Sequence, residues 1–231
     1  MPSLAQPTLA EEQMDAPDLD PAIYAAVLSD LARVNRFTMT ARPTLSFLKR
    51  ALGDRTEFSL LDVGFGDGDL LRKIARWAER RRVDARLAGV DLNPKSAAVA
   101  IAKTPAEMNI AYETGDYLDH VDRGFDLIVS SQVAHHMNRN QLLTFLRAME
   151  ATARLGWQIS DLHRHRLSYH GYPFLARIMG WHRIVREDGQ LSIARSFRPP
   201  EWRPILASAG IGPEAVVRRY FPFRLCVERL R

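Results

Sequence analysis

The 231 residues of the chain are 46% hydrophobic and 26% charged, and the net charge is +5. A chain of this length supports one domain with one sizeable core, and no apolar run is long enough to cross a bilayer. The positive charge comes almost entirely from arginine. Runs such as residues 80–82 suit the C-terminal end of a helix, so the charge alone does not indicate a nucleic-acid partner.

The single cysteine and the N-terminal residues bear on the cellular setting. Cys226 is the only cysteine, which excludes an intrachain disulfide and a cysteine zinc cluster. The N-terminal residues are acidic and do not resemble a secretory signal. We therefore expect a cytoplasmic location.

The first 55 residues divide into two parts. Residues 1–20 are rich in Pro, Ala and acids without periodicity, which predicts a flexible tail. From residue 21, apolar residues recur at helical spacing, and a second helical pattern passes through Leu45, Leu48 and Leu52. Residues 21–55 are therefore expected to form an N-terminal helical cap.

From residue 56 the chain alternates between strand and helix patterns, which predicts a parallel sheet. Residues 163–195 interrupt this alternation with a long mixed segment that we expect to be helical over 174–181, and such long excursions are usually functional. The predicted strands are 58–63, 85–91, 110–114, 125–130, 156–162, 216–220 and 223–227, and the predicted helices are 69–82, one from residue 94, 140–154 and 199–209.

A glycine-rich turn follows the first strand, in the sequence Asp62-Val63-Gly64-Phe65-Gly66-Asp67-Gly68. Glycines there allow a tight turn and a close approach of the backbone to a ligand. A dinucleotide fingerprint would place its third glycine at position 69, where this chain has Asp69. The turn is acidic and lacks Lys and Arg, so it favours a cationic ligand over a pyrophosphate.

This turn resembles the first motif of class I S-adenosylmethionine-dependent methyltransferases, and most closely that of bacterial small-molecule enzymes of quinone and natural-product pathways. The resemblance covers about residues 56–231. It implies an α/β fold with a doubly wound, mostly parallel seven-stranded Rossmann-like sheet of order 3-2-1-4-5-7-6, in which strand 7 is antiparallel. It also implies S-adenosylmethionine as the cofactor.

The resemblance implies a set of cofactor contacts at the carboxyl ends of the strands. Asp91 ends the second strand, where it would accept hydrogen bonds from ribose hydroxyls or belong to a helix cap. Asp116 would receive the adenine amino group with Tyr117 against the ring, or Gly115-Asp116 would be an ordinary turn. The expected cofactor-binding residues are Asp62, Gly64, Phe65, Gly66, Gly68, Asp91, Leu92, Asp116, Tyr117, Ser131 and Gln132.

Two histidine-containing segments are candidates for the acceptor side. His135 and His136 follow the fourth strand, in a segment that borders the reacting methyl group in small-molecule methyltransferases. Imidazole titrates near neutrality and can accept a proton, although a histidine that caps or packs a helix start is an equally good interpretation. In an extended segment Asp161, His163 and His165 share one face, which predicts an acid/base cluster.

A metal site at this second segment is the weaker interpretation, because the Asp with Asp-Asn pattern of the catechol-type enzymes is absent, and we expect no metal. The predicted catalytic residues are His136, His163, His135 and Asp161, and the predicted substrate-binding residues are Asn35, Arg36, Arg164 and Tyr169. For Asn35 and Arg36 ordinary loop capping is the alternative.

The sequence thus predicts a methyltransferase that acts on a small molecule, by O-methylation of a hydroxylated aromatic or polyketide-like compound in secondary metabolism. C-methylation of a quinol-type ring is the nearest variant. An NAD(P)-dependent oxidoreductase and a non-catalytic S-adenosylmethionine-binding partner are alternatives from other classes. A nucleic-acid substrate is disfavoured, because Ser130-Ser131-Gln132-Val133 stands where an Asn/Asp-Pro-Pro-aromatic motif would be expected. We expect a monomer or homodimer without a membrane span.

Overall fold

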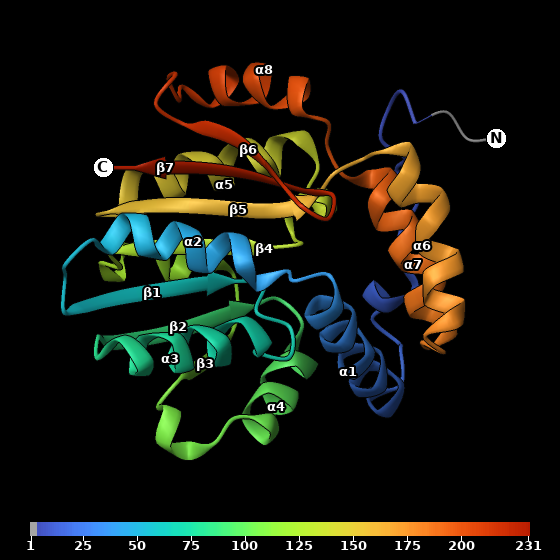
Figure 1. The fold of residues 1–231 in the computed structure, drawn as a ribbon, viewed down its shortest axis with the longest axis horizontal. Helices are drawn as coiled ribbons and strands as arrows, with labels where there is room; N and C mark the ends of the chain where they lie inside the picture. The colour runs from blue at the N-terminus through green and yellow to red at the C-terminus, as the bar shows by residue number, and fades with distance from the viewer. Residues whose placement is uncertain (1–3) are drawn as a thin grey trace.

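The computed structural model describes residues 4–231 and is built around one seven-stranded sheet of order β3-β2-β1-β4-β5-β7-β6 (Figure 1). Five neighbouring strands run parallel, and β7 is antiparallel to both β5 and β6. The predicted fold class is confirmed. The strands are β1 (Glu57–Val63), β2 (Asp84–Asp91), β3 (Ala111–Thr114), β4 (Leu127–Ser131), β5 (Gly156–Leu162), β6 (Val216–Tyr220) and β7 (Arg224–Leu230).

Helices cover both faces of the sheet, and none within residues 4–231 has the length and apolarity that a membrane crossing requires. The α-helices are α1 (Pro21–Phe37), α2 (Ala41–Leu52), α3 (Asp69–Arg81), α4 (Pro94–Lys103), α5 (Arg139–Thr152), α6 (Arg166–Ile178), α7 (Arg183–Arg195) and α8 (Pro199–Ala209). Short 3-10 helices are η1 (Gln13–Asp15), η2 (Ala106–Met108), η3 (Tyr117–Asp119), η4 (Val121–Arg123) and η5 (Ala134–His136).

The strand β1 shows why the sheet is covered on both sides. Its side chains alternate between the two faces, as the pleat requires. Phe58 and Leu60 pack in one core with residues of α2 and α3, while Leu61 and Val63 pack in the other with residues of α5 and α8. A continuous apolar run is therefore buried on both faces, as is typical of a parallel sheet.

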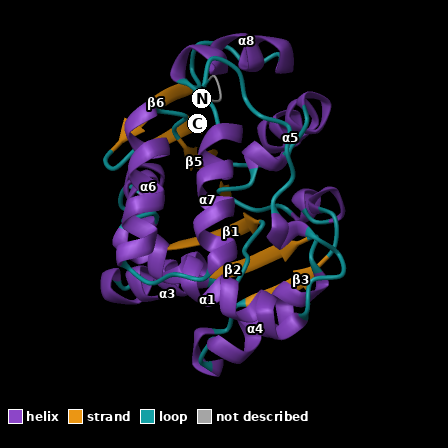
Figure 2. Cartoon of the chain, turned by 90° about the vertical axis from the view of Figure 1, so that its right-hand side faces the viewer, coloured by secondary structure: helices purple, strands orange, loops and turns teal. Residues whose placement is uncertain are grey.

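The insertion at 163–195 forms two helices, α6 and α7, where the sequence predicted one central helix. Gly180, with φ +66°, lies in the turn between them, and the His182 side chain caps α7 by accepting from the Ile184 amide. Both helices contribute to a small third core with α1, through Ala176, Trp181 and residues of α7. In Figures 1 and 2, α1, α6 and α7 stand beside the carboxyl ends of the parallel strands, and we call these three helices the cap.

Two parts of the first 55 residues differ from the expected organisation. The helix α2 packs on the sheet through Phe47 and Leu48, so it is not part of the cap. Glu12 is only 4% exposed, and the Gln13 and Met14 amides donate to the Asp188 carboxylate at 3.0 and 2.9 Å. Residues 12–14 are therefore packed, in contrast to the flexible tail we expected over residues 1–20, of which residues 1–3 lie outside the described part of the chain. Their partners lie some 175 positions away, where a local pattern cannot reveal them.

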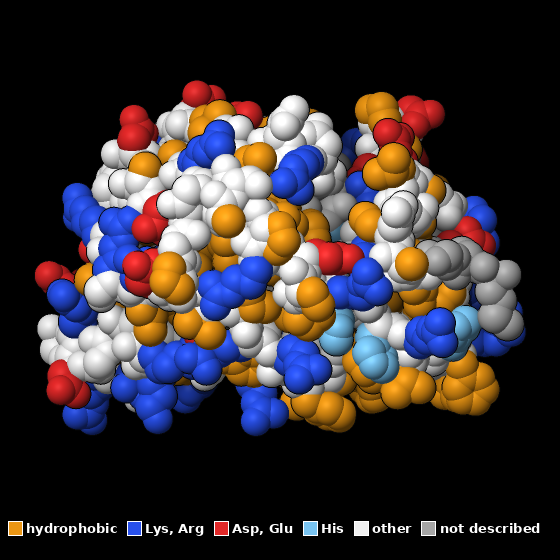
Figure 3. All heavy atoms as spheres, turned by 90° about the horizontal axis from the view of Figure 1, so that it is seen from above, with side chains coloured by type: hydrophobic (Ala, Val, Ile, Leu, Met, Phe, Trp, Pro, Cys, Tyr) orange, Lys and Arg blue, Asp and Glu red, His pale blue; other side chains and the backbone are white. Residues whose placement is uncertain are grey.

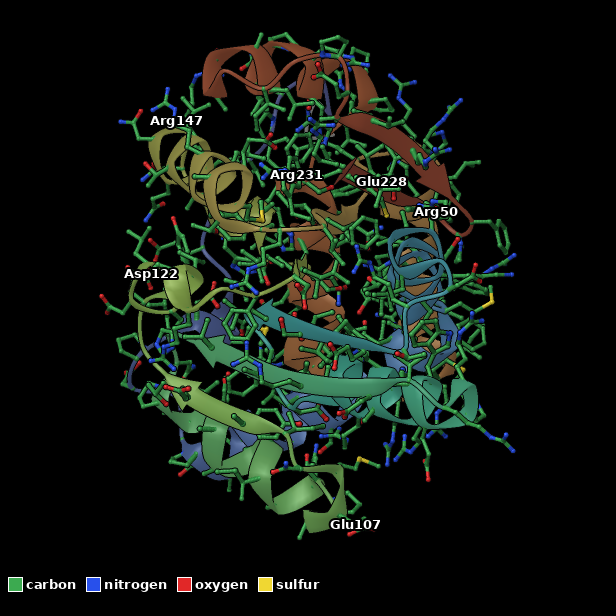
Figure 4. All side chains as sticks on the ribbon, turned by 90° about the vertical axis from the view of Figure 1, so that its left-hand side faces the viewer. Arg50, Glu107, Asp122, Arg147, Glu228 and Arg231 are labelled. Atoms are coloured by element: carbon green, nitrogen blue, oxygen red, sulfur yellow. The ribbon has the colours of Figure 1, made fainter. Side chains whose placement is uncertain are left out.

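At the other edge of the sheet, a buried carboxylate joins four elements. Glu228 of β7 is 3% exposed and accepts from Arg50 of α2 at 2.7 Å, from Arg218 of β6 at 2.5 Å and from Gln158 of β5 at 3.1 Å. Figure 4 labels Arg50 and Glu228 where α2 meets β7. The paired guanidinium groups offset the cost of burying this charge.

Candidate functional site

A cavity of about 680 Å³ opens at the carboxyl ends of β1, β2 and β4, beneath the cap. Ligand sites of α/β sheets form at this edge, where neighbouring strands connect to opposite faces. The volume suits a small-molecule ligand. The cavity is lined both by the glycine turn and by residues of α1 and of the N-terminal segment, including Tyr24, Leu28 and Met14.

Two glycines of the turn line the cavity, and their backbone dihedral angles explain why these positions are glycine. Gly64 and Gly66 have φ +77° and +56°, a region that favours glycine. A Cβ on Gly64 would lie 2.3 Å from Val133 Cγ2. The Gly66 amide donates to Asp91 Oδ2 at 2.9 Å, which ties the turn to the end of β2.

Gly68 does not line the cavity, in contrast to its predicted role as a cofactor contact. It precedes α3 with φ +75°, and a Cβ there would lie 2.4 Å from the Tyr112 hydroxyl oxygen. Close packing against β3 accounts for this third glycine.

Asp62 presents an unsatisfied acid to the cavity. It is 1% exposed, and its Oδ1 has no hydrogen-bond partner among the described residues. Burial and, to a smaller extent, the nearby charge of Asp91 together raise the pKa of Asp62 to about 8. A buried oxygen without a partner is unfavourable. A cationic ligand in this cavity would supply both a hydrogen-bond donor and a compensating charge.

The other expected cofactor contacts lie along the same cavity. Asp91 Oδ1 accepts from the Asn93 amide at 2.9 Å, and burial raises the pKa of Asp91 in spite of its backbone donors. The Gln132 side chain donates to Asn35 Oδ1 at 2.9 Å, which brings Asn35 of α1 to the cavity wall. The remaining expected contacts that line the cavity are Phe65, Leu92, Asp116, Tyr117 and Ser131.

The histidines of η5 also line the cavity, and we call His135 and His136 the histidine pair. His135 is buried, with Nδ1 2.7 Å from Asp161 Oδ1, and its amide donates to Asp161 Oδ2 at 3.0 Å. Burial opposes the charged ring, but the carboxylates of Asp161 and Glu12 outweigh it and raise the pKa of His135 to about 9. His136 is more open to the cavity, and its Nδ1 lies 2.8 Å from Asp15 Oδ2.

Glu12 and Asp15 of the N-terminal segment meet the histidine pair, and sequence reasoning missed both. Glu12 Oε1 accepts from the Ser192 hydroxyl at 2.8 Å and lies 3.5 Å from His135 Nε2. The only signal in the sequence is a group of acids at 11–20 in a chain that is otherwise basic.

The predicted cluster of Asp161, His163 and His165 does not form. Asp161 faces His135, whereas the His163 and His165 rings lie 5.3 Å apart and neither lines the cavity. The strand β5 ends at Leu162, so side-chain alternation cannot be extended to residues 163 and 165.

Three predicted substrate-binding residues also lie away from the cavity. Arg164 is 2% exposed, donates to the Ser196 carbonyl at 2.7 Å and pairs with Glu201, so it holds the insertion to α8. Tyr169 lies on α6 outside the cavity lining. Arg36 lines a separate, more open depression beside α2.

Comparisons with known proteins agree with this geometry. Residues 60–156 match the family model described as a methyltransferase domain. No curated protein sequence gives a significant match. Magnesium protoporphyrin IX methyltransferase from Synechocystis PCC 6803 with bound SAH has a TM-score of 0.57 at 18% identity, over 84% of this chain and 83% of that one.

Two further solved structures are similar. A SAM-dependent methyltransferase from Aquifex aeolicus has a TM-score of 0.61 at 15% identity, over 91% of this chain and 98% of that one. Human N-acetylserotonin methyltransferase in complex with SAM has a TM-score of 0.66 at 14% identity, over 97% of this chain and 60% of that one. At these identities the likeness is one of fold.

Proposed function

Residues 60–156 match a methyltransferase domain, and we propose that the chain is a class I S-adenosylmethionine-dependent methyltransferase that methylates a hydroxyl group of a small aromatic or polyketide-like molecule. The observation that carries the proposal is the position of the histidine pair. It lines the same cavity as the glycine turn and the unsatisfied Asp62. One cavity thus combines a site for a cationic methyl donor with an imidazole, that of His136, which can draw off a proton.

The residues of the cavity fit the methyl donor, which supplies an activated methyl group on a sulfonium when it is bound. Asp62 Oδ1 is free to accept a hydrogen bond from an ammonium group. Both oxygens of Asp91 accept one backbone amide each, and a carboxylate oxygen has a second lone pair for a ribose hydroxyl. We assign Asp116 and Tyr117 to the adenine end and Ser131 and Gln132 to the methionyl end.

The acceptor is assigned to the part of the cavity between the histidine pair and the cap. Met14, Leu28 and Leu31 line the cavity, which suits an apolar ring. Methyl transfer needs a nucleophile held in line with the S–methyl bond, so positioning supplies much of the acceleration. A phenolic or enolic hydroxyl must also lose its proton, and we assign that proton to His136, the more open member of the histidine pair.

We also propose that residues 21–37 and 163–195 act together as an acceptor-binding cap on the methyltransferase domain of residues 56–231. A cytoplasmic location and a role in secondary metabolism remain predictions from the sequence, as does the monomeric or dimeric state.

The test is the variant His136→Ala, assayed with methyl-labelled S-adenosylmethionine against a panel of hydroxylated aromatics and quinols. We expect turnover to fall by about 10²- to 10⁴-fold, the range of general acid–base contributions, while calorimetric affinity for the cofactor stays within about twofold. The control is His163→Ala, which lies outside the cavity and should retain turnover. NMR of the product distinguishes an O-methyl from a C-methyl group.

The proposal is wrong if NADH, and not S-adenosylmethionine, raises the melting temperature of the protein. Methylation of RNA with no activity on any small hydroxylated compound would equally contradict it.

A further inference from the structure

Three metal-ligand atoms converge in the cavity from two distant parts of the chain. Glu12, His135 and His136 each offer one ligand atom, and these three atoms lie within 4.8 Å of one another. Glu12 Oε1 is 3.5 Å from His135 Nε2 and 3.8 Å from His136 Nε2. Both separations are long for a hydrogen bond, whereas two ligands bound at about 2.0–2.1 Å to one tetrahedral ion lie about 3.4 Å apart.

The buried imidazole of His135 gives independent evidence for a ligand at this point. The residue is 6% exposed, and its Nε2 has no hydrogen-bond partner among residues 4–231. A buried ring nitrogen that makes no hydrogen bond is unfavourable. An ion bound to Nε2 would satisfy it, together with the Glu12 carboxylate beside it.

The surrounding hydrogen bonds hold all three ligand side chains in position. His135 Nδ1 is paired with Asp161 at 2.7 Å, and His136 Nδ1 is paired with Asp15 at 2.8 Å. Metal-binding histidines commonly donate their second ring N–H to a carboxylate, which fixes the ring and leaves the other nitrogen for the metal. Ser192 in turn donates to Glu12 Oε1 at 2.8 Å.

We propose that Glu12, His135 and His136 form a binding site for a divalent transition-metal ion, with Zn²⁺ the ion that the ligand set suits best. Two imidazoles and one carboxylate are a common set for zinc, while Mg²⁺ and Ca²⁺ prefer oxygen ligands alone. This set differs from Asp161, His163 and His165, which we considered in the sequence. It could not be found there, because Glu12 is 123 positions from His135 in the chain.

If the proposed function is correct, the acceptor can supply the fourth ligand of the ion. All three ligands line the cavity, so a hydroxyl oxygen of the acceptor can reach the ion. With the ion bound, coordination makes the acceptor hydroxyl more acidic, so its proton would pass to solvent, and the histidine pair would act as metal ligands and not as the proton acceptor. This role depends on the proposed function, but the metal site itself does not.

The test measures zinc binding on the tag-free full-length chain after treatment with a chelator. Zn²⁺ is titrated in competition with a chromophoric chelator, and elemental analysis gives the stoichiometry. We expect one Zn²⁺ per chain, with affinity reduced at least tenfold in Glu12→Gln and His136→Ala. Asp15→Asn removes an outer hydrogen bond and should weaken binding about 10- to 100-fold.

The matched control is His163→Ala. His163 and His165 form a second pair of neighbouring rings, outside the cavity. We expect this variant to bind zinc like the wild type. Zinc binding that is lost in His163→Ala would contradict the proposed site, because the histidines outside the cavity would then be the ligands.

Glu12→Gln keeps the size and shape of the side chain, and unchanged circular dichroism would confirm that the variant is folded. His135→Ala is avoided because it would leave Asp161 buried without its partner. The Co²⁺-loaded wild type should show the visible absorption of a low-symmetry site, and Glu12→Gln should change that spectrum.

The inference is overturned if the wild type binds no stoichiometric Zn²⁺, or if Glu12→Gln and His136→Ala both bind it with unchanged affinity. Calorimetry with S-adenosylmethionine separates this failure from a failure of the proposed function. Cofactor binding without zinc binding removes only the metal site, whereas loss of cofactor binding contradicts the methyltransferase function.

Discussion

Asp62 is a buried acid in a cavity that we assign to a cationic ligand, and this combination couples ligand binding to a proton. With a pKa of about 8, the carboxyl is mostly protonated at pH 7 in the free protein. A cation beside it favours the ionised form, so binding should release a proton. In the free protein the folded state holds this proton more tightly than the unfolded state does. The free energy of unfolding is therefore highest below about pH 4 with respect to this group, and it falls as the pH rises through 8.

We therefore expect calorimetry at pH 7, in buffers of different ionisation enthalpy, to show net proton release when S-adenosylmethionine binds. Affinity should rise between pH 6 and pH 8, by at most about tenfold per pH unit. Asp62→Asn should bind more weakly and release fewer protons. Equal heats in all buffers for the wild type would show that Asp62 does not ionise on binding.

At the scale of the residue, the sequence predicted the cavity residues at the carboxyl ends of strands. It missed residues whose position depends on partners far away in the sequence. Asp91 and Asp116 could be placed from the sequence because Asp91 ends β2 and Asp116 lies two residues beyond the end of β3. Glu12 could not be recovered, since its burial depends on Ser192 and on the histidine pair. Arg164 was misassigned because an isolated arginine gives no sign that Glu201 will pair with it inside the protein.

At the scale of the element, the glycine turn connects β1 to α3 and serves two purposes at neighbouring positions. Gly64 keeps the turn clear of Val133, just before the histidine pair, while Gly68 keeps it clear of Tyr112 on β3. The two glycines should therefore respond differently to substitution.

We predict that Gly64→Ala lowers both stability and affinity for S-adenosylmethionine, whereas Gly68→Ala lowers mainly stability. Each should cost about 1–3 kcal/mol through the left-handed backbone, with a further cost from the clash. Gly210→Ala is the control, because φ is +79° but nothing lies within 4 Å of its Cβ, so only the backbone cost of about 1–3 kcal/mol is expected, without the clash. Urea unfolding and calorimetry measure the two effects, and equal loss of affinity in both turn variants would contradict this division.

Element boundaries were predicted well where the apolar pattern is continuous and less well where charge is buried. The range of β5 was predicted correctly, because Trp157, Ile159 and Leu162 mark an apolar stretch that begins at Gly156. The strand β7 extends to Leu230, beyond the predicted end at residue 227. The prediction ended before Glu228 because a charged residue interrupts the apolar pattern. In the structure Arg50 and Arg218 pair with Glu228, which allows it to be buried within the strand.

At the scale of the whole molecule, the cap and the sheet have cores of different size. The cap core consists of a few residues of α1, α6 and α7, whereas each face of the sheet has an extensive core. Segments with fewer buried apolar contacts open at lower free energy. Figure 3 shows the molecule from above, and on this face Lys and Arg side chains are spread out with acidic side chains among them.

We expect hydrogen exchange followed by mass spectrometry to show α6 and α7 exchanging faster than β1 and β4. The helix α5, which packs on the sheet through Phe145 and Leu146, is the internal control and should be protected. An acceptor or inhibitor that fills the cavity should slow exchange in the cap. Exchange in α6 and α7 as slow as in β1 would mean that cap and sheet open as one unit.

The antiparallel β7 lies between β5 and β6, so β6 reaches the sheet only through a strand that follows it in the chain. During synthesis on the ribosome, β6 emerges first and has no strand to pair with. The parallel part of the sheet can assemble as it emerges, but this edge must wait for residues 224–230. Until then β5 exposes an unpaired edge, which is the period when a nascent chain is most open to pairing with a neighbour.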